Sequence, residues 1–102
     1  MKILITGGAG FIGSQLGYYL HKKGHDITLV DDMSFGHEDN LIVNGEKFGT
    51  FFKYDVRDKN ISEIISENEI IYHFAGISSL PVCQEEPCRA MDVNLQGTIN
   101  VL

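Results

Sequence analysis

The sequence lacks any apolar run near the roughly 18 residues that a membrane span needs, and it is poor in cations. Its 8 lysines and arginines stand against 14 aspartates and glutamates, which leaves a formal net charge of −6 over 102 residues. No basic patch is present, so we expect neither nucleic acid nor an anionic membrane surface as a partner. The N-terminus reaches its glycines too soon for a signal peptide, and we expect a cytoplasmic protein.

Cysteine is scarce as well. Cys83 and Cys88 are the two cysteines of the chain, and no nearby histidine completes a ligand set, so no metal is expected. A disulfide between them is disfavoured in a cytosolic chain, and we expect reduced thiols. A hydrophobic content of 43% and a charged content of 22% are ordinary for one globular domain or a part of one.

Glycine, in contrast, forms the most informative motif. Residues 6–13 read Thr-Gly-Gly-Ala-Gly-Phe-Ile-Gly and place Gly7, Gly10 and Gly13 at intervals of three. An apolar strand pattern precedes the motif and a helical pattern follows it. A tight glycine turn lets a pyrophosphate approach the backbone, and the positive helix end receives its charge. The context predicts a dinucleotide site rather than a plain glycine-rich turn.

The hydrophobic pattern predicts alternating strands and helices. The expected strands are 2–6, 26–31, 50–54 and 69–75, and the expected helices are 11–23, 60–67 and 87–102. Residues 33–38 read as a loop, and the segment to Gly49 as irregular. Parallel crossover units of this kind predict an α/β, Rossmann-type doubly wound sheet with the order 3-2-1-4. The last helix has no terminal cap, so we expect residues 1–102 to be an incomplete part of a larger dinucleotide-binding domain.

Asp31 ends the second expected strand and is the candidate ligand of the adenosine ribose. Its carboxylate suits both ribose hydroxyls and repels a 2′-phosphate. No arginine or lysine occurs between Asp31 and Lys47, so the sequence favours NAD over NADP. The alternative is that Asp31 and Asp32 form a solvated turn.

Further candidates follow the third and fourth strands. Asp55 and the backbone of Val56 suit adenine recognition, and Asp58 is near enough to the next helix to cap it, which would leave Asp55 free. His73 is expected to be a packed strand residue rather than a catalyst. Ser78 and Ser79 lie at the mouth of the site and either bind substrate or are ordinary loop serines.

Asn94 lies within the last expected helix. It either ties that helix to the end of the fourth strand or is a solvent-exposed helical residue.

Taken together, these motifs resemble the extended short-chain dehydrogenases/reductases, and in particular their NAD-dependent nucleotide-sugar epimerases and dehydratases. The resemblance implies NAD as the cofactor, with Phe11 and Ile12 at the pyrophosphate, Asp31 at the ribose, and Asp55 and Val56 at adenine. The implied cofactor-binding set is Gly7, Gly10, Phe11, Ile12, Gly13, Asp31, Asp32, Met33, Ser34, Asp55, Val56, Phe74, Ala75, Gly76 and Asn94. Many epimerases of the family carry lysine where this chain has Ser78, which leaves the particular substrate open.

The resemblance also implies hydride transfer between a sugar carbon and nicotinamide, with a UDP- or dTDP-sugar as substrate. The family's catalytic serine or threonine and its Tyr-x-x-x-Lys pair fall beyond Leu102, so no catalytic residue is expected in the chain and we expect it to be inactive alone. Tyr18 and Lys22, like Tyr19 and Lys23, fit that spacing, but they are ordinary neighbours one helical turn apart.

Two alternatives to this function stay open: a non-catalytic dinucleotide sensor and an NAD(P)-dependent reductase. The apolar stripe of the last helix fits either a homodimer interface, as the resemblance implies, or cover by further chain.

Overall fold

A parallel sheet of four strands forms the centre of the molecule. The computed structural model describes residues 1–77 and 79–102. The strands are β1 (Lys2–Thr6), β2 (Asp26–Asp31), β5 (Thr50–Lys53) and β6 (Ile70–His73), and their order is β5-β2-β1-β6 with every pair parallel. This confirms the predicted order. β5 and β6 end one and two residues earlier than predicted, so the residues after them lie in loops at the carboxyl edge of the sheet.

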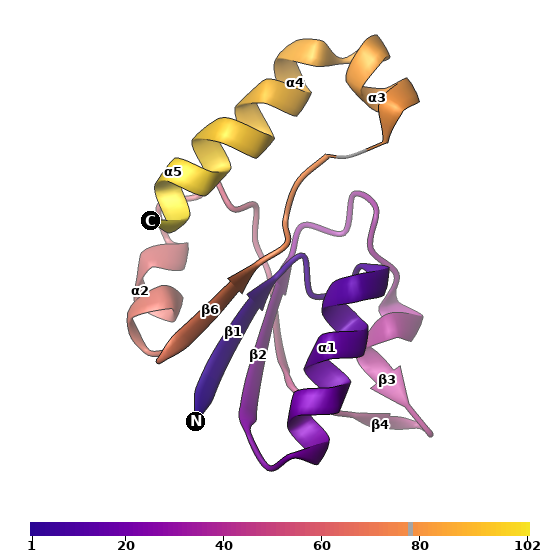
Figure 1. Cartoon of the computed structure of the whole chain (residues 1–102), viewed down its shortest axis with the longest axis vertical. Helices are drawn as coiled ribbons and strands as arrows, with labels where there is room; N and C mark the ends of the chain where they lie inside the picture. The colour runs from indigo at the N-terminus through magenta and orange to yellow at the C-terminus, as the bar shows by residue number, and fades with distance from the viewer. Residues whose placement is uncertain (78) are drawn as a thin grey trace.

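Helices cover both faces of this sheet, as a doubly wound fold requires. Helix α1 (Phe11–Lys22) lies on one face, and α2 (Ile61–Ser66) with α5 (Gly97–Val101) lies on the other (Figure 1). Alternate strand residues feed two cores: Ile3 and Ile5 pack towards α1, whereas Ile71 packs towards α2 and α5. The alternation follows from the pleat of the strands, whose successive side chains point to opposite faces.

The segment predicted to be irregular is ordered. It contains a 3-10 turn, η1 (Glu38–Leu41), and a short antiparallel hairpin of β3 (Ile42–Val43) and β4 (Glu46–Lys47). Asn44 and Gly45 join the two strands with φ values of 54° and 81°, the backbone of a primed two-residue turn. Phe48 follows the hairpin and is buried in the core, edge-on to the ring of Tyr18.

The predicted helix from residue 87 to the end is also more complex. It consists of α4 (Pro87–Met91), a π-helical turn, η2 (Asp92–Gln96), and α5, and a separate helix, α3 (Leu80–Glu85), precedes it. Gly97 is buried where this helix meets the loop after β5, and a Cβ there would lie 2.6 Å from Val56 Cγ2. Asn100 fixes the same contact by donating to the carbonyl oxygens of Val56 and Asp58.

None of the helices that the structure describes is long and apolar enough to cross a membrane.

Candidate functional site

The glycine turn needs its glycines because the backbone passes very close to its neighbours. Gly7 has φ +67°, and a Cβ there would lie 2.9 Å from the Ala75 nitrogen. A Cβ on Gly13 would collide with the Gly7 carbonyl oxygen. The Gly10 N–H donates to that same oxygen at 3.1 Å. The turn therefore packs backbone on backbone, which leaves no room for side chains.

The N-terminus of α1 directly follows this turn and has no side-chain cap. Gly10 is the N-cap residue, no described side chain caps the first N–H groups, and the first turn holds no acidic residue. The first N–H groups of a helix lack intrahelical partners and carry positive partial charge. Phe11 and Ile12 leave their side chains 76% and 65% exposed at this end. The arrangement suits an anion bound at the backbone.

Asp31 is held at the end of β2 by backbone donors. Its carboxylate accepts from the Ala9 N–H at 3.0 Å and from the Met33 N–H at 2.8 Å. Met33 adopts a left-handed φ of 67° to make this turn. Gly36 packs closely against the carboxylate, and a Cβ on Gly36 would lie only 3.0 Å from Asp31 Oδ2. The fold thus fixes the orientation of the acid beside the glycine turn.

Asp55 is not free, contrary to the prediction. Its carboxylate accepts from the Arg57 backbone N–H at 2.9 Å and from the Arg57 guanidinium at 2.6 Å. The same guanidinium reaches Asp92 in η2. Hydrogen bonding by Arg57 lowers the pKa of the Asp55 carboxyl, although burial opposes this, and Asp55 with Asp92 raises the pKa of Arg57. The Asp58 carboxylate accepts from the Asn60 N–H just before α2, but α2 itself has no side-chain cap.

His73 links β1 to the last helix. The Thr98 hydroxyl donates to the Asn94 carbonyl, so it accepts from His73 Nε2 at 3.0 Å. The Thr6 hydroxyl accepts from the Ala75 N–H and lies 2.6 Å from His73 Nδ1. A neutral ring with its proton on Nε2 satisfies every group, and burial lowers the pKa of this histidine. The geometry agrees with a packed strand residue.

Asn94 ties the last helix to the segment after β6, as the first of its two alternatives predicted, although the residue is also exposed, as the second predicted. Its amide accepts from the Ile77 N–H at 2.6 Å and donates to the Ile77 carbonyl at 2.9 Å. Ser79 is exposed at the start of α3. Ser78, and with it the comparison with lysine, lies outside the described residues.

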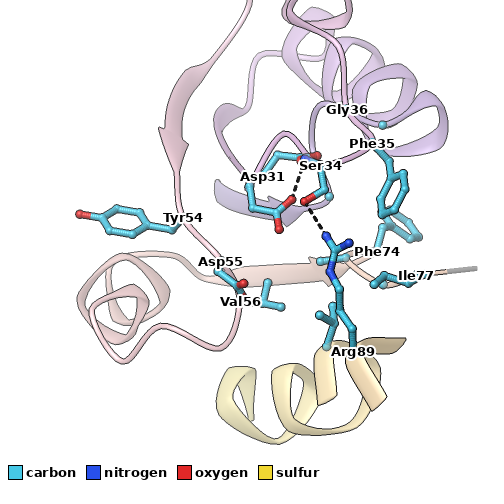
Figure 2. A pocket seen from close by; sticks show the side chains of 16 residues that line it. Asp31, Ser34, Phe35, Gly36, Tyr54, Asp55, Val56, Phe74, Ile77 and Arg89 are labelled. Atoms are coloured by element: carbon cyan, nitrogen blue, oxygen red, sulfur yellow. Dashed lines mark hydrogen bonds between the residues drawn. The ribbon is translucent and has the colours of Figure 1, made fainter. Parts of the chain in front are cut away.

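These elements meet in one pocket at the carboxyl edge of the sheet, where Figure 2 shows side chains converging from the β2 loop, the β5 loop and α4. The lining residues are Gly7, Gly10, Asp31, Asp32, Ser34, Phe35, Gly36, Tyr54, Asp55, Val56, Phe74, Ala75, Gly76, Ile77, Arg89 and Val93. Most of the predicted set is therefore brought together.

Five predicted residues do not line the pocket: Phe11, Ile12, Gly13, Met33 and Asn94. Six that the sequence reasoning missed do line it: Phe35, Gly36, Tyr54, Ile77, Arg89 and Val93. Gly36 had a local sequence signal, because it is a glycine in the loop that follows Asp31 at the end of β2. Arg89 had no local sequence signal, because it reaches the pocket only through the packing of α4 against the β2 loop.

The two Tyr-x-x-x-Lys pairs lie along α1, outside the pocket lining. Lys22 Nζ lies 5.4 Å from the Tyr18 ring centroid, and Lys23 Nζ lies 5.4 Å from that of Tyr19. Both are contacts between side chains four residues apart, along α1 and at its C-cap residue Lys23. Within residues 1–77 and 79–102, no group of three or more histidine, cysteine, aspartate or glutamate side chains is placed to hold a metal ion.

The chain is similar to a family of known proteins along nearly its whole length. The family model described as "NAD dependent epimerase/dehydratase family" matches residues 3–102. A UDP-N-acetyl-alpha-D-glucosaminuronate decarboxylase of Bacillus cytotoxicus is 34% identical over 105 residues, which cover 99% of this chain and 32% of that protein.

Two solved structures are also similar. A UDP-glucose 4-epimerase of Thermotoga maritima with UDP-glucose superposes with a TM-score of 0.89 at 33% identity, over 99% of this chain and 32% of that one. A UDP-glucose 4-epimerase of Thermus thermophilus in complex with NAD gives 0.85 at 34% identity, over 99% and 32%. The chain thus spans about a third of the length of these relatives.

Proposed function

The chain belongs to the NAD-dependent epimerase/dehydratase family, and we propose that it is the NAD-binding portion of a nucleotide-sugar epimerase or dehydratase. The observation that carries this proposal is that Gly10, the N-cap residue of α1, and a fixed ribose-type acid, Asp31, line one pocket. These are the two groups that a dinucleotide needs, one for its diphosphate and one for its ribose.

The residues present fit NAD. The backbone cradle at Gly7 and Gly13 admits no Cβ, so it leaves the helix N-terminus open to a diphosphate. Asp31 is oriented to accept from ribose hydroxyls, and Asp55 with Val56 borders the part of the pocket suited to adenine. Phe74, Ala75 and Gly76 follow β6 and offer backbone for the rest of the molecule to lie against. When bound, NAD supplies a reversible hydride acceptor.

The substrate proposed for the complete protein is a UDP- or dTDP-sugar. The relative that contains UDP-glucose supports this class, and the decarboxylase leaves the type of reaction on the sugar open. We expect no turnover from the 102 residues alone. The pocket lining holds no lysine, and its tyrosine, Tyr54, points away from the pocket in Figure 2. Conversion of UDP-glucose by the chain would contradict this expectation.

A protein of the same fold that binds NAD without catalysing a reaction would serve as a sensor. The sensor alternative gains support if no partner segment or longer form of the protein turns over a nucleotide sugar. The reductase alternative uses the same cofactor half, and net oxidation or reduction of a substrate would distinguish it from an epimerase, which returns its hydride.

We also propose that the last helix contributes to a homodimer. Met91, Leu95 and Ile99 are 64%, 56% and 53% exposed at successive turns, which is a large apolar face for a free surface. Light scattering is expected to give a dimer that Leu95→Glu dissociates, whereas Gln96→Glu, on the same turn, leaves it intact. A monomeric wild-type chain would contradict the proposal.

Calorimetric titration of the full chain with NAD tests the main proposal. We expect saturable binding with one site per chain. Asp31→Asn keeps the shape and removes the charge, so affinity is expected to fall about tenfold through the loss of a charge-assisted hydrogen bond. Asp26→Asn is the matched control, because Asp26 is exposed at the opposite end of the same strand. Absence of NAD binding, or equal losses in the two variants, would overturn the proposal.

A further inference from the structure

Arg89 brings a positive charge to the ribose corner of the pocket from a distant part of the chain. It lies in α4, and its Nη2 donates to the Ser34 hydroxyl at 3.2 Å, across 55 residues of sequence. Its guanidinium carbon stands 5.8 Å from the Phe35 ring centroid. Figure 2 shows the side chain extending from α4 across the pocket to Ser34 in the β2 loop, and Asp31 lines the same pocket.

The charge of Arg89 is the less committed of the two arginines near the pocket. Arg57 is held by Asp55 and Asp92, both at hydrogen-bonding distance. Among the residues that the structure describes, Arg89 forms one ion pair, with Glu86 at 3.2 Å on its own helix turn, and Glu86 is half exposed and does not line the pocket. A solvent-exposed pair of this kind contributes only about 0–1 kcal/mol, so a bound anion can draw the guanidinium away.

The position of this charge matters because of how dinucleotide sites separate NAD from NADP. An acid at the end of the second strand binds the 2′-hydroxyl, and a nearby arginine accommodates a 2′-phosphate. In this chain Asp31 is that acid, and no lysine or arginine occurs between it and Lys47. The fold supplies the cation from α4, next to the hydroxyl of Ser34, three residues after the acid.

We propose that Arg89 lets this protein bind 2′-phosphorylated dinucleotides, that is NADP, as well as NAD. The inference rests on the proposed NAD-binding function and deepens it. The guanidinium leaves the Ser34 hydroxyl for the 2′-phosphate, and both groups then donate to the phosphate oxygens. Asp31 still repels that phosphate, so NAD remains the tighter ligand, but Arg89 offsets part of the difference in affinity.

Two short probes isolate the ribose corner from the rest of the site. Calorimetry of the full chain with 5′-AMP and 2′,5′-ADP, and then with NAD and NADP, gives two affinity ratios, and the ligands of each pair differ only by the 2′-phosphate. Arg89→Met is expected to weaken the 2′-phosphorylated ligand of each pair at least about tenfold more than its partner, because a charged hydrogen bond is lost. Arg89→Lys keeps the charge and is expected to restore part of the ratio. Added salt lowers the effect as it screens exposed charge.

Lys47→Met is the matched control, since it removes the same charge on the exposed β4 strand, outside the pocket lining. It is expected to leave both ratios unchanged, and circular dichroism checks that each variant is folded. If NAD binds and Arg89→Met moves neither ratio, the inference is overturned while the proposed function stands. If NAD does not bind at all, the proposed function and this inference are both overturned.

Discussion

The side-chain amide of Asn94 pairs with both backbone groups of Ile77. The Ile77 N–H donates to Asn94 Oδ1 at 2.6 Å, and Asn94 Nδ2 donates to the Ile77 carbonyl at 2.9 Å. One side chain in the π-helical turn therefore replaces the strand partner that the segment after β6 no longer has. Ile77 is buried with Val93 and Ala90, so the pairing fixes the pocket wall next to Gly76, where a Cβ would lie 3.1 Å from Asn94 Oδ1.

Asn94→Ala is therefore expected to loosen this wall. Two hydrogen bonds are lost, each contributing about 1 kcal/mol, so the free energy of unfolding is expected to fall by about 2 kcal/mol. Urea denaturation measures the loss, and calorimetry with NAD is expected to show weaker binding. Gln96→Ala is the control, because Gln96 is exposed in the same turn as Asn94 but makes no side-chain hydrogen bond to the described residues. Equal stabilities of the two variants would contradict this role for Asn94.

Gly13→Ala tests the backbone packing of the glycine turn. The added methyl group meets the Gly7 carbonyl, and Gly13 is buried, so the turn or α1 must move. Overpacking of this kind costs about 1–3 kcal/mol of unfolding free energy, and NAD binding is expected to be lost with the turn geometry. Urea denaturation and calorimetry measure the two effects.

The control for Gly13 is Gly45→Asn in the β3–β4 hairpin. Gly45 has φ +81° and open space around its Cβ position, and asparagine tolerates this backbone region. We expect this variant to bind NAD like the wild type. A Gly13→Ala variant that binds NAD equally well would show that the close approach to Gly7 is unnecessary.

Arg57→Gln tests the link between the β5 loop and η2. Because hydrogen bonding from Arg57 lowers the pKa of the Asp55 carboxyl, removal of the guanidinium is expected to raise that pKa back towards its ordinary value. Carbon NMR of the Asp55 carboxyl during an acid titration measures the shift. Lys47→Gln removes an equal charge far from Asp55 and is expected to leave the titration unchanged. An unmoved Asp55 pKa in Arg57→Gln would contradict the assignment.

The sequence predicted the sheet well because its strands are buried and nearly continuous in apolar residues. Lys2–Thr6 and Asp26–Asp31 were predicted to the residue, and the strand order follows from right-handed crossovers. The β3–β4 hairpin was missed although its Asn44-Gly45 dipeptide is a strong hairpin signal. The short strands beside it lack a long apolar alternation.

The site was less predictable where contacts join distant segments. Asp31 could be found from its place at a strand end, because that position is local to the sequence. The commitment of Asp55 to Arg57 was open to prediction too, since only one residue separates them, but the reach of Arg57 to Asp92 depends on how the last helix packs. The arrival of Arg89 at Ser34 depends on the same packing, and no local pattern encodes it.

His73 makes the stability of the fold depend on pH. The structure holds its ring neutral between the hydroxyls of Thr6 and Thr98, and burial lowers its pKa below the ordinary value of about 6.5. The unfolded chain then binds the proton more readily than the folded one. Stability from this group is complete above about pH 6.5 and falls as the pH drops from there through the folded pKa.

Urea denaturation between about pH 7.5 and 5.5 measures this contribution. The wild-type free energy of unfolding is expected to fall more steeply with decreasing pH than that of His73→Gln, which keeps a polar side chain but cannot titrate. His21→Gln is the control, because His21 is exposed on α1, and its profile is expected to follow the wild type. Asp55, whose pKa is lowered from an already acidic value, affects stability only below this window. A difference between wild type and His73→Gln within the window therefore belongs to the histidine, and parallel profiles would show that its proton does not oppose the fold.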